Sequence, residues 1–188
     1  MAYQLYYWTA CKSFWGRAIG VILTLDEAGV EYTIHPPEEV PVPQRFTFPV
    51  LTLAEGLSMG QVPAILNVLG QRFGLAGTTD AERIASQEAV LDVDDVFAEA
   101  QGGKFTKDPD RAAKWFSLLD TKLADHRYLV TDSPTVADFH AVFATEWVHK
   151  CYRKDAYDSY PHLARWWRDI CAHPPVHRMK TGDIPMIP

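Results

Sequence analysis

Apolar and polar residues follow two different spacings in the first part of the chain. Apolar side chains alternate with polar ones over residues 3–7 and 30–34, and β-forming residues fill 49–53, as in short strands. Residues 17–28 and 61–73 have the apolar content of helices, and a glycine follows each. With a short strand before the second helix, the predicted order is strand, helix, strand, loop, hairpin and helix. This order is typical of a small α/β unit with a mixed sheet.

The second part of the chain has only helical spacing. Each predicted helix begins at a capping residue or next to a proline in the first helical position, and continues with an apolar face. The predicted helix starts are Thr79, Asp108, Thr135 and Tyr160. We expect Pro174 and Pro175 to stop the last helix. We therefore predict an α/β domain over residues 1–74 and an all-helical domain over residues 79–188.

Composition and charge restrict the functions that need to be considered. Of the 188 residues, 47% are hydrophobic, which is too high a fraction for a disordered chain. The 18 Lys and Arg against 24 Asp and Glu give a net charge of −6, which argues against a nucleic-acid partner. No apolar run approaches the roughly 20 residues that span a membrane, and the first residues lack a secretory signal pattern. Three widely spaced cysteines favour a reducing, cytoplasmic location.

Four stretches of sequence resemble the cytosolic glutathione S-transferases, in particular their tyrosine-type, sigma-like classes. The stretches are YQLYYW with the GRA after it, FPVLTLAEGLSMGQVPAIL, RFGLAGTTDAER, and SPTVADF with YPHLARWWRDICAHPPV. The resemblance implies an N-terminal thioredoxin-like domain followed by a helical bundle. It also implies glutathione as co-substrate, a small hydrophobic electrophile as second substrate, a role in detoxification and a homodimer.

The resemblance further implies a hydroxyl group beside the glutathione sulfur. A thiol is mostly protonated at neutral pH, and a hydrogen bond donated to the sulfur favours the reactive thiolate. Tyr7 has the place of this donor in tyrosine-type members. The longer loop after it contains Cys11 and Ser13, where cysteine-type and serine-type classes have their catalytic residue. We rank Tyr7 first, Ser13 second (as sulfur donor or as helix N-cap) and Cys11 third.

The same resemblance implies which residues bind glutathione. Phe48–Pro49 has the place of a cis-proline pair whose backbone binds the cysteinyl part, and Gln61–Val62 that of a helix start that binds the γ-glutamyl carboxylate. Val62 has no hydroxyl where serine is usual, which predicts weaker binding. Asp94–Asp95 has the place of acids that reach the partner subunit's glutathione. The implied binding residues are Tyr7, Trp8, Arg17, Arg45, Phe48, Pro49, Gln61, Val62 and Asp95.

Two other hypotheses compete with conjugation. Cys11 as a nucleophile would make the protein a glutathione-dependent thiol-transferase, and a catalytically idle family member would have a structural or binding role. We expect the electrophile between the two domains, near Phe105, Trp115 and Met179. The seven histidines show no catalytic pairing and no metal-ligand spacing, so we predict no metal site.

Overall fold

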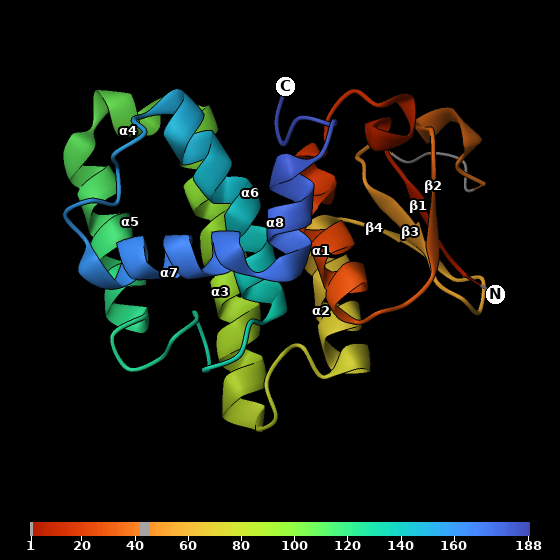
Figure 1. The fold of residues 1–188 in the computed structure, drawn as a ribbon, viewed down its shortest axis with the longest axis horizontal. Coiled ribbons are helices and arrows are strands. Elements are labelled where there is room, and N and C mark those ends of the chain that lie inside the picture. The colour runs from red at the N-terminus through yellow and green to blue at the C-terminus, as the bar shows by residue number, and fades with distance from the viewer. Residues whose placement is uncertain (1, 42–45) are drawn as a thin grey trace.

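The sheet lies at one end of the molecule (Figure 1). In the computed structural model, which describes residues 2–41 and 46–188, four short strands form one mixed sheet in the order β2-β1-β3-β4. β1 runs parallel to β2 and antiparallel to β3, and β4 is antiparallel to β3. The strands are β1 (Tyr3–Tyr6), β2 (Tyr32–His35), β3 (Val50–Thr52) and β4 (Ser58–Gly60). The predicted mixed sheet is confirmed, with slightly shorter strands.

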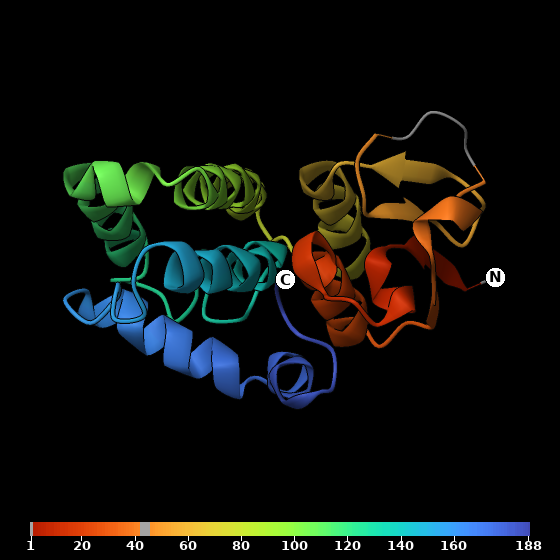
Figure 2. The same cartoon turned by 90° about the horizontal axis from the view of Figure 1, so that it is seen from above.

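Two helices separate the sheet from the rest of the molecule. α1 (Ile19–Glu27) and α2 (Val62–Phe73) lie between the sheet and the helical part (Figures 1 and 2). The side chains from Ile19 to Leu25 are buried, because α2, α6 and α8 all pack against α1. A helix that is apolar nearly all round is expected in such a place.

Helices α3 and α6 lie side by side at the centre of the helical part (Figures 1 and 2). The helices here are α3 (Asp80–Gln101), α4 (Lys104–Lys107), α5 (Pro109–Lys122), α6 (Val136–Cys151), α7 (Pro161–Ala172) and α8 (Pro174–Thr181). All four predicted helix starts are confirmed. For example, the Thr79 hydroxyl accepts a hydrogen bond from the Glu82 N–H at 3.2 Å, which is one half of a capping box.

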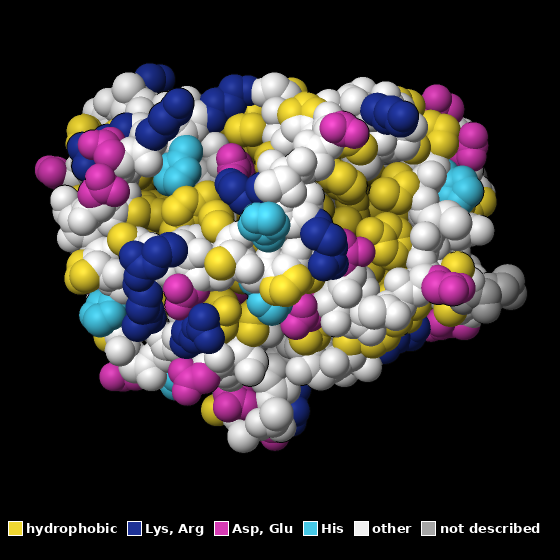
Figure 3. Space-filling model, in the orientation of Figure 1, with side chains coloured by type: hydrophobic (Ala, Val, Ile, Leu, Met, Phe, Trp, Pro, Cys, Tyr) yellow, Lys and Arg dark blue, Asp and Glu magenta, His cyan; other side chains and the backbone are white. Residues whose placement is uncertain are grey.

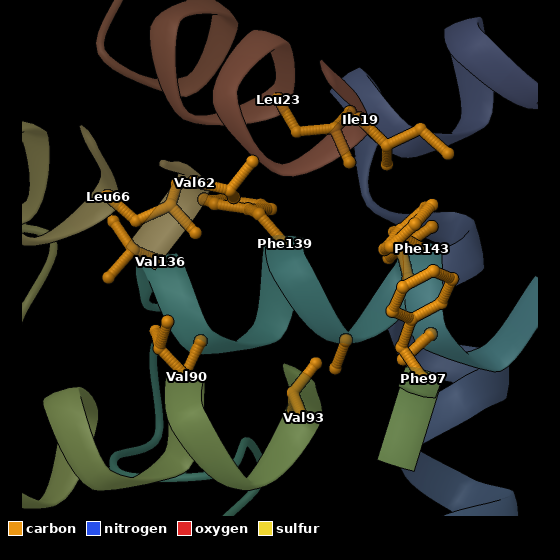
Figure 4. Close-up of a cluster of buried hydrophobic side chains, with 14 of the residues drawn as sticks. Ile19, Leu23, Val62, Leu66, Val90, Val93, Phe97, Val136, Phe139 and Phe143 are labelled. Atoms are coloured by element: carbon orange, nitrogen blue, oxygen red, sulfur yellow. The ribbon is translucent and has the colours of Figure 1, made fainter. Parts of the chain in front are cut away.

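One hydrophobic core joins the two parts of the chain (Figure 4). Where the two parts meet, side chains of four helices contribute to it: Ile19 and Leu23 of α1, Val62 and Leu66 of α2, Val90, Val93 and Phe97 of α3, and Val136, Phe139 and Phe143 of α6. Full burial of a large apolar side chain contributes about 1.5–3 kcal/mol, so this shared core fixes the two parts against each other. We propose residues 1–74 and 79–188 as two domains packed through it.

A buried carboxylate holds the start of α6. Asp138 is 0% exposed. Its Oδ2 accepts hydrogen bonds from the N–H and the hydroxyl of Thr135 at 2.8 and 2.9 Å. Its Oδ1 accepts from the Leu129 N–H and the Trp166 indole N–H, both at 2.9 Å. Burial raises the pKa of Asp138, while these four bonds favour the ionised form. The prediction of a buried, structural Asp138 is confirmed.

The structure contains short helices that the sequence did not predict. α7 ends before Pro174 as expected, but Pro174 also begins α8, because a proline in the first helical turn loses no hydrogen bond. α4 is a single turn, and three 3₁₀ helices are shorter still. These are η1 (Trp8–Cys11), η2 (Gly16–Ala18) and η3 (Pro37–Glu39). Such segments are too short to show a period, so hydrophobic spacing cannot reveal them.

One face of the molecule is mixed in charge. Figure 3 shows Lys and Arg side chains interspersed with Asp and Glu over one face. Within residues 2–41 and 46–188, no helix combines the length and the apolar character needed to cross a bilayer.

Candidate active site

Tyr7 directly follows β1, and the backbone at Arg17, after the next loop, holds its hydroxyl group in place. The Tyr7 side chain is buried, with its ring edge-on to those of Trp8 and Phe14 at centroid distances of 5.3 and 5.9 Å. The phenolic oxygen accepts a hydrogen bond from the backbone N–H of Arg17 at 2.9 Å. Because the oxygen is the acceptor in this bond, the hydroxyl hydrogen remains available to a ligand.

Gly16 allows the backbone to approach the phenol this closely. Its φ is +49°, and a Cβ at this position would lie 2.4 Å from the Tyr7 hydroxyl oxygen, so a side chain is excluded both by strain and by contact. On its other side, the same turn binds a distant segment. Trp15 N–H donates to the Pro185 carbonyl at 2.9 Å, and Gly16 N–H donates to the Met186 carbonyl at 2.7 Å.

The environment of Tyr7 keeps its phenol protonated at neutral pH. Burial raises the pKa of Tyr7, and the hydrogen bond and charge of Arg17 lower it by less. A neutral phenol is a hydrogen-bond donor rather than a base. Tyr7 is therefore suited to donate a hydrogen bond to an anionic atom that lies beside it.

A hollow lined by aromatic rings opens next to Tyr7, between the sheet domain and helices α3 and α6. We call it the ring-lined hollow. It has a volume of about 200 Å³. Its walls are Tyr7, Phe14, Gly16, Arg17, Phe97, Gln101, Phe143, Trp147 and Pro188. The rings of Phe97 and Phe143 lie 4.5 Å apart between centroids, and Figure 4 shows that both come from facing helices. Such walls favour a flat, apolar ligand.

A second hollow, which we call the cis-proline hollow, has a volume of about 160 Å³ and lies between Arg17, Thr47, Phe48, Gln61 and Val62. The Phe48–Pro49 peptide bond is cis, as the sequence predicted. Of the lining residues that the structure describes, Arg17 is shared by both hollows. The two hollows are therefore neighbours, with the Arg17 side chain at their boundary.

The start of α2 forms one wall of the cis-proline hollow. Gln61 precedes the helix with a φ of +67°, which is a strained conformation for a residue other than glycine. Val62 is only 3% exposed, since its side chain belongs to the core. The intrahelical bonds begin at Ile65, whose N–H donates to the Gln61 carbonyl at 3.0 Å. Pro63 has no N–H, so Val62 and Ala64 supply the unpaired amides of this first turn.

Arg17 places a positive charge between the two hollows. Its guanidinium lies 4.4 Å from the centroid of the Phe97 ring and 3.9 Å from Oδ1 of Asp94. The side chain is 44% exposed, so it can still bind an anionic ligand. Arg17 thus combines a cation–π contact with a weak ion pair.

Comparison with known proteins identifies the family. Residues 104–174 match the domain family described as "Glutathione S-transferase, C-terminal domain". A glutathione S-transferase of Hyoscyamus muticus is 34% identical over 65 residues, which are 35% of this chain and 31% of that protein. Hematopoietic prostaglandin D synthase of Gallus gallus is 30% identical over 152 residues, which are 72% of this chain and 75% of that protein. The chain belongs to the glutathione S-transferase family.

The whole fold agrees with this family. The crystal structure of the glutathione S-transferase from Ascaris lumbricoides superimposes with a TM-score of 0.78 at 23% identity, and the match covers 95% of each chain. In sequence, the chain spans about a third of the length of the plant transferases that it matches.

In this glutathione transferase family member, Cys11 is the last residue of η1 and Ser13 lies in the loop after it. The Thr9 hydroxyl donates to the Phe14 carbonyl at 3.1 Å, so this loop folds on itself. Cys11 and Ser13 are both exposed, and neither is a wall residue of the two hollows as the structure describes them. Ser13 as a helix N-cap is wrong, because the backbone turns into η2 only after Trp15.

Three other residues were predicted to bind glutathione: Trp8, Arg45 and Asp95. Trp8 is 40% exposed and edge-on to Phe48, at 5.2 Å between ring centroids, so it lies beside the cis-proline hollow. Arg45 lies outside the described residues. Asp95 is exposed on α3, whereas its neighbour Asp94 is the one that faces Arg17.

The walls of the ring-lined hollow were not predicted from the sequence. Phe97, Phe143 and Trp147 have core spacing on their helices, and nothing in that spacing marks them as ligand-facing. None of the three residues expected near the electrophile, Phe105, Trp115 and Met179, lines the ring-lined hollow as the structure describes it. Phe105 is fully buried against Phe116, Trp115 donates its indole N–H to Glu99 at 3.1 Å, and Met179 is buried on α8.

Among the described residues of this family member, three histidines pair with carboxylates. His140 Nε2 lies 2.9 Å from Asp94 Oδ1, His173 Nε2 lies 2.7 Å from Glu27 Oε2, and His35 Nδ1 lies 3.2 Å from Glu39 Oε2. None of these pairs is part of a larger cluster: the part of the chain that the structure describes contains no group of three or more His, Cys, Asp and Glu residues that could bind a metal ion.

Proposed function

We propose that the protein activates the thiol of glutathione and conjugates it to small hydrophobic electrophiles. The observation that supports this most is the position of the Tyr7 hydroxyl. It is held by the Arg17 N–H, it has its own hydrogen available, and it lies at the wall of the ring-lined hollow. The cis-proline hollow, where the family resemblance places glutathione, is adjacent through Arg17.

The proposed chemistry needs one hydrogen bond and good placement. The Tyr7 O–H donates to the glutathione sulfur, which stabilises the thiolate after its proton has left to solvent. The sulfur then attacks an electrophilic carbon in the ring-lined hollow: with an aryl halide, the carbon–sulfur bond forms, the carbon–halogen bond breaks and the halide ion leaves to solvent. Holding both reactants in neighbouring hollows makes this a reaction between pre-oriented partners.

Glutathione is proposed to bind as an extended tripeptide along the cis-proline hollow. Its cysteinyl part would pair with the backbone at Phe48–Pro49, and its γ-glutamyl carboxylate would accept from the Val62 and Ala64 amides beside Gln61. Because Val62 has no hydroxyl and Pro63 has no N–H, this end offers fewer donors than a helix start with serine. We therefore expect measurable but weak glutathione binding.

The remaining predicted binding residues surround this tripeptide. In the proposal, Arg17 binds a carboxylate, Trp8 covers the cysteinyl part, and Arg45 binds the glycyl end. Asp95 reaches the glutathione of the partner subunit in a homodimer. Two large apolar side chains on α3, Ile84 at 67% and Leu91 at 51% exposure, support a subunit contact on this helix. Light scattering during gel filtration tests the dimer.

The proposal also includes a cellular setting. Cys11, Cys151 and Cys171 are free thiols in the structure, as is usual in a reducing cytoplasm. A cytoplasmic transferase with an apolar electrophile site would serve in detoxification.

A pair of adjacent tyrosines gives the sharpest test of the mechanism. We expect Tyr7→Phe to lower kcat with a chromogenic aryl halide about 10- to 100-fold, since a hydrogen bond to a charged group is worth about 1.5–3 kcal/mol. The loss should be largest below the pKa of the bound thiol, because removal of the donor raises that pKa. The matched control is Tyr6→Phe. Tyr6 is equally buried, but its hydroxyl donates to Gln4 at 2.9 Å on the other face of the sheet.

The competing hypotheses give different results in the same assays. If Tyr7→Phe keeps full activity while Ser13→Ala or Cys11→Ser loses it, the role of Tyr7 is wrong. A thiol-transferase would reduce a mixed disulfide in a reaction that Cys11→Ser abolishes. An idle family member would show neither activity and no heat of glutathione binding at millimolar concentration.

A further inference from the structure

His140 is a fully buried histidine that the proposed chemistry does not use. It lies on α6 and is 0% exposed. Its ring stacks on the ring of Phe143, a wall residue of the ring-lined hollow, at a centroid distance of 6.0 Å and an angle of 20°. Gly20 of α1 makes room for it, since a Cβ there would lie 3.1 Å from the His140 Cα and 3.3 Å from its Nδ1. His140 therefore lies directly behind the hollow.

One nitrogen of His140 has a partner and the other does not. Nε2 lies 2.9 Å from Asp94 Oδ1. Nδ1 is buried and has no hydrogen-bond partner among the described residues. An unpaired buried polar atom destabilises the folded state. An apolar residue would avoid this cost, so the bond from Nε2 to Asp94 is the feature that distinguishes histidine at this position.

Asp94 connects His140 to Arg17. Burial raises the pKa of Asp94, but the hydrogen bond from His140 and the charge of Arg17 outweigh this and hold the pKa below its usual value. Asp94 is thus ionised and accepts hydrogen bonds, so His140 carries its proton on Nε2 and donates. The same Asp94 oxygen lies 3.9 Å from the Arg17 guanidinium.

The Asp94 carboxylate is the charged group that lies beside the Arg17 guanidinium in the described structure. The Arg17 side chain is half exposed. Its guanidinium lies over the ring faces of Phe97 and Phe143, and its charged partner among the described residues is Asp94. We propose that His140 is a positioning residue: it fixes the Asp94 carboxylate, which in turn holds the Arg17 guanidinium at the boundary between the two hollows. The consequence for glutathione binding rests on the proposed function.

The test compares two substitutions of His140 with a matched control. His140→Leu fills the space but removes the donor, and His140→Gln keeps an N–H donor. The control is His173→Leu, because His173 makes the same kind of pair with Glu27 at 2.7 Å but is not among the lining residues of either hollow. The first measurement is NMR of the Arg17 Nε–Hε group in the free protein, which reports its order without any substrate.

We expect the Arg17 Nε–Hε signal to lose its order in His140→Leu and to keep it in His140→Gln and His173→Leu. The KM for glutathione should rise about fivefold in His140→Leu, the size of a coupling between contacting residues, with a smaller change in kcat. His140→Gln should return KM to within about twofold of the parent protein. In an Arg17→Met background, His140→Leu should have no further effect on KM, because its target is gone.

Three results would overturn the proposal. One is an unchanged Arg17 signal in a folded His140→Leu protein. The second is an equal rise in KM in His140→Leu and His140→Gln, and the third is a further rise in KM when His140→Leu is added to Arg17→Met. If His140→Leu does not fold, Asp94→Asn replaces it in the same measurements. The NMR measurement does not depend on catalysis or on glutathione. If the protein binds no glutathione, the proposed function is refuted, but the NMR signal of Arg17 still decides the role of His140.

Discussion

The starts of α6 and α2 are built in opposite ways. At the start of α6, every oxygen of Asp138 is used by protein donors, and the whole group is buried. At the start of α2, Gln61 is exposed, has a positive φ and gives no side-chain cap in the described structure. Both are first turns of helices with the same need for acceptors at their free amides.

The difference separates a structural helix start from one that is available to a ligand. The α6 start is satisfied by the fold itself, so it contributes to stability and has nothing left to bind. The α2 start keeps the Val62 and Ala64 amides beside a hollow, so an external carboxylate can complete it. The positive φ of Gln61 is consistent with a ligand-binding role for the α2 start, because strained backbone conformations are concentrated at functional sites.

The largest effect is expected at the α6 start. Asp138→Asn replaces one acceptor with an amide that faces buried donors, and removal of one partner from a buried charged network costs about 3 kcal/mol or more. Urea unfolding followed by circular dichroism measures this. The control is Asp110→Asn, an exposed residue in the first turn of α5, which should change stability by less than about 0.5 kcal/mol. Equal effects would show that the α6 start is not specially stabilised.

A hydroxyl added to the α2 start should increase ligand binding. We expect Val62→Ser to tighten glutathione binding by about tenfold, since a hydrogen bond to a charged group is worth about 1.5–3 kcal/mol. The same change removes a buried apolar side chain and should lower the melting temperature. Val62→Ala is the control, because it loses the same packing without gaining a donor. Calorimetry that finds equal affinities in the two variants would contradict a carboxylate at this helix start.

Relief of strain at Gln61 should separate stability from binding. Gln61→Gly places at φ +67° the residue that tolerates it and should stabilise the protein by about 1 kcal/mol, after the entropy cost of glycine. Gln61→Ala keeps the strain and should give no such gain. Thermal unfolding measures both. Glutathione affinity should fall in both variants; if it does not, the Gln61 side chain takes no part in binding.

The smallest effect concerns an exposed helix start. At α3, Glu82 accepts hydrogen bonds from the Thr78 and Thr79 amides at 2.6 and 2.9 Å, and these lower its pKa from 4.5 to about 2. A lowered pKa in the folded state stabilises the protein above pH 4.5, and this contribution is lost as the pH falls towards 2. Glu82→Gln should therefore destabilise at pH 7 and lose its effect in acid. Exposed Glu38→Gln should show no such trend.

These three helix starts also show what the sequence can predict about the fold. Thr79 with Glu82 and Thr135 with Asp138 are local signals, because the capping side chain and its amide lie three residues apart. The strands were predictable for the same reason, since alternation is a local property. α8 was not, because the two prolines before Val176 read equally well as an end and as a beginning.

The candidate site was predictable only in its backbone-defined part. Tyr7, the cis Phe48–Pro49 bond and the Gln61 helix start belong to short motifs that the family resemblance identifies. The ring-lined hollow depends on how α3 and α6 approach η2, which no local pattern encodes. The link from Arg17 through Asp94 to His140 joins three separate elements, and a buried histidine on an apolar helix gives no sign of its partner in sequence.

The bonds from Trp15 and Gly16 to the Pro185 and Met186 carbonyls have a consequence for biosynthesis. The turn that directs the Arg17 amide to Tyr7 is completed by residues translated some 170 positions later. While the chain is still on the ribosome, the first strand and helix can form, but this turn lacks two of its partners. The turn beside the phenol is therefore completed only after residue 186 has been translated.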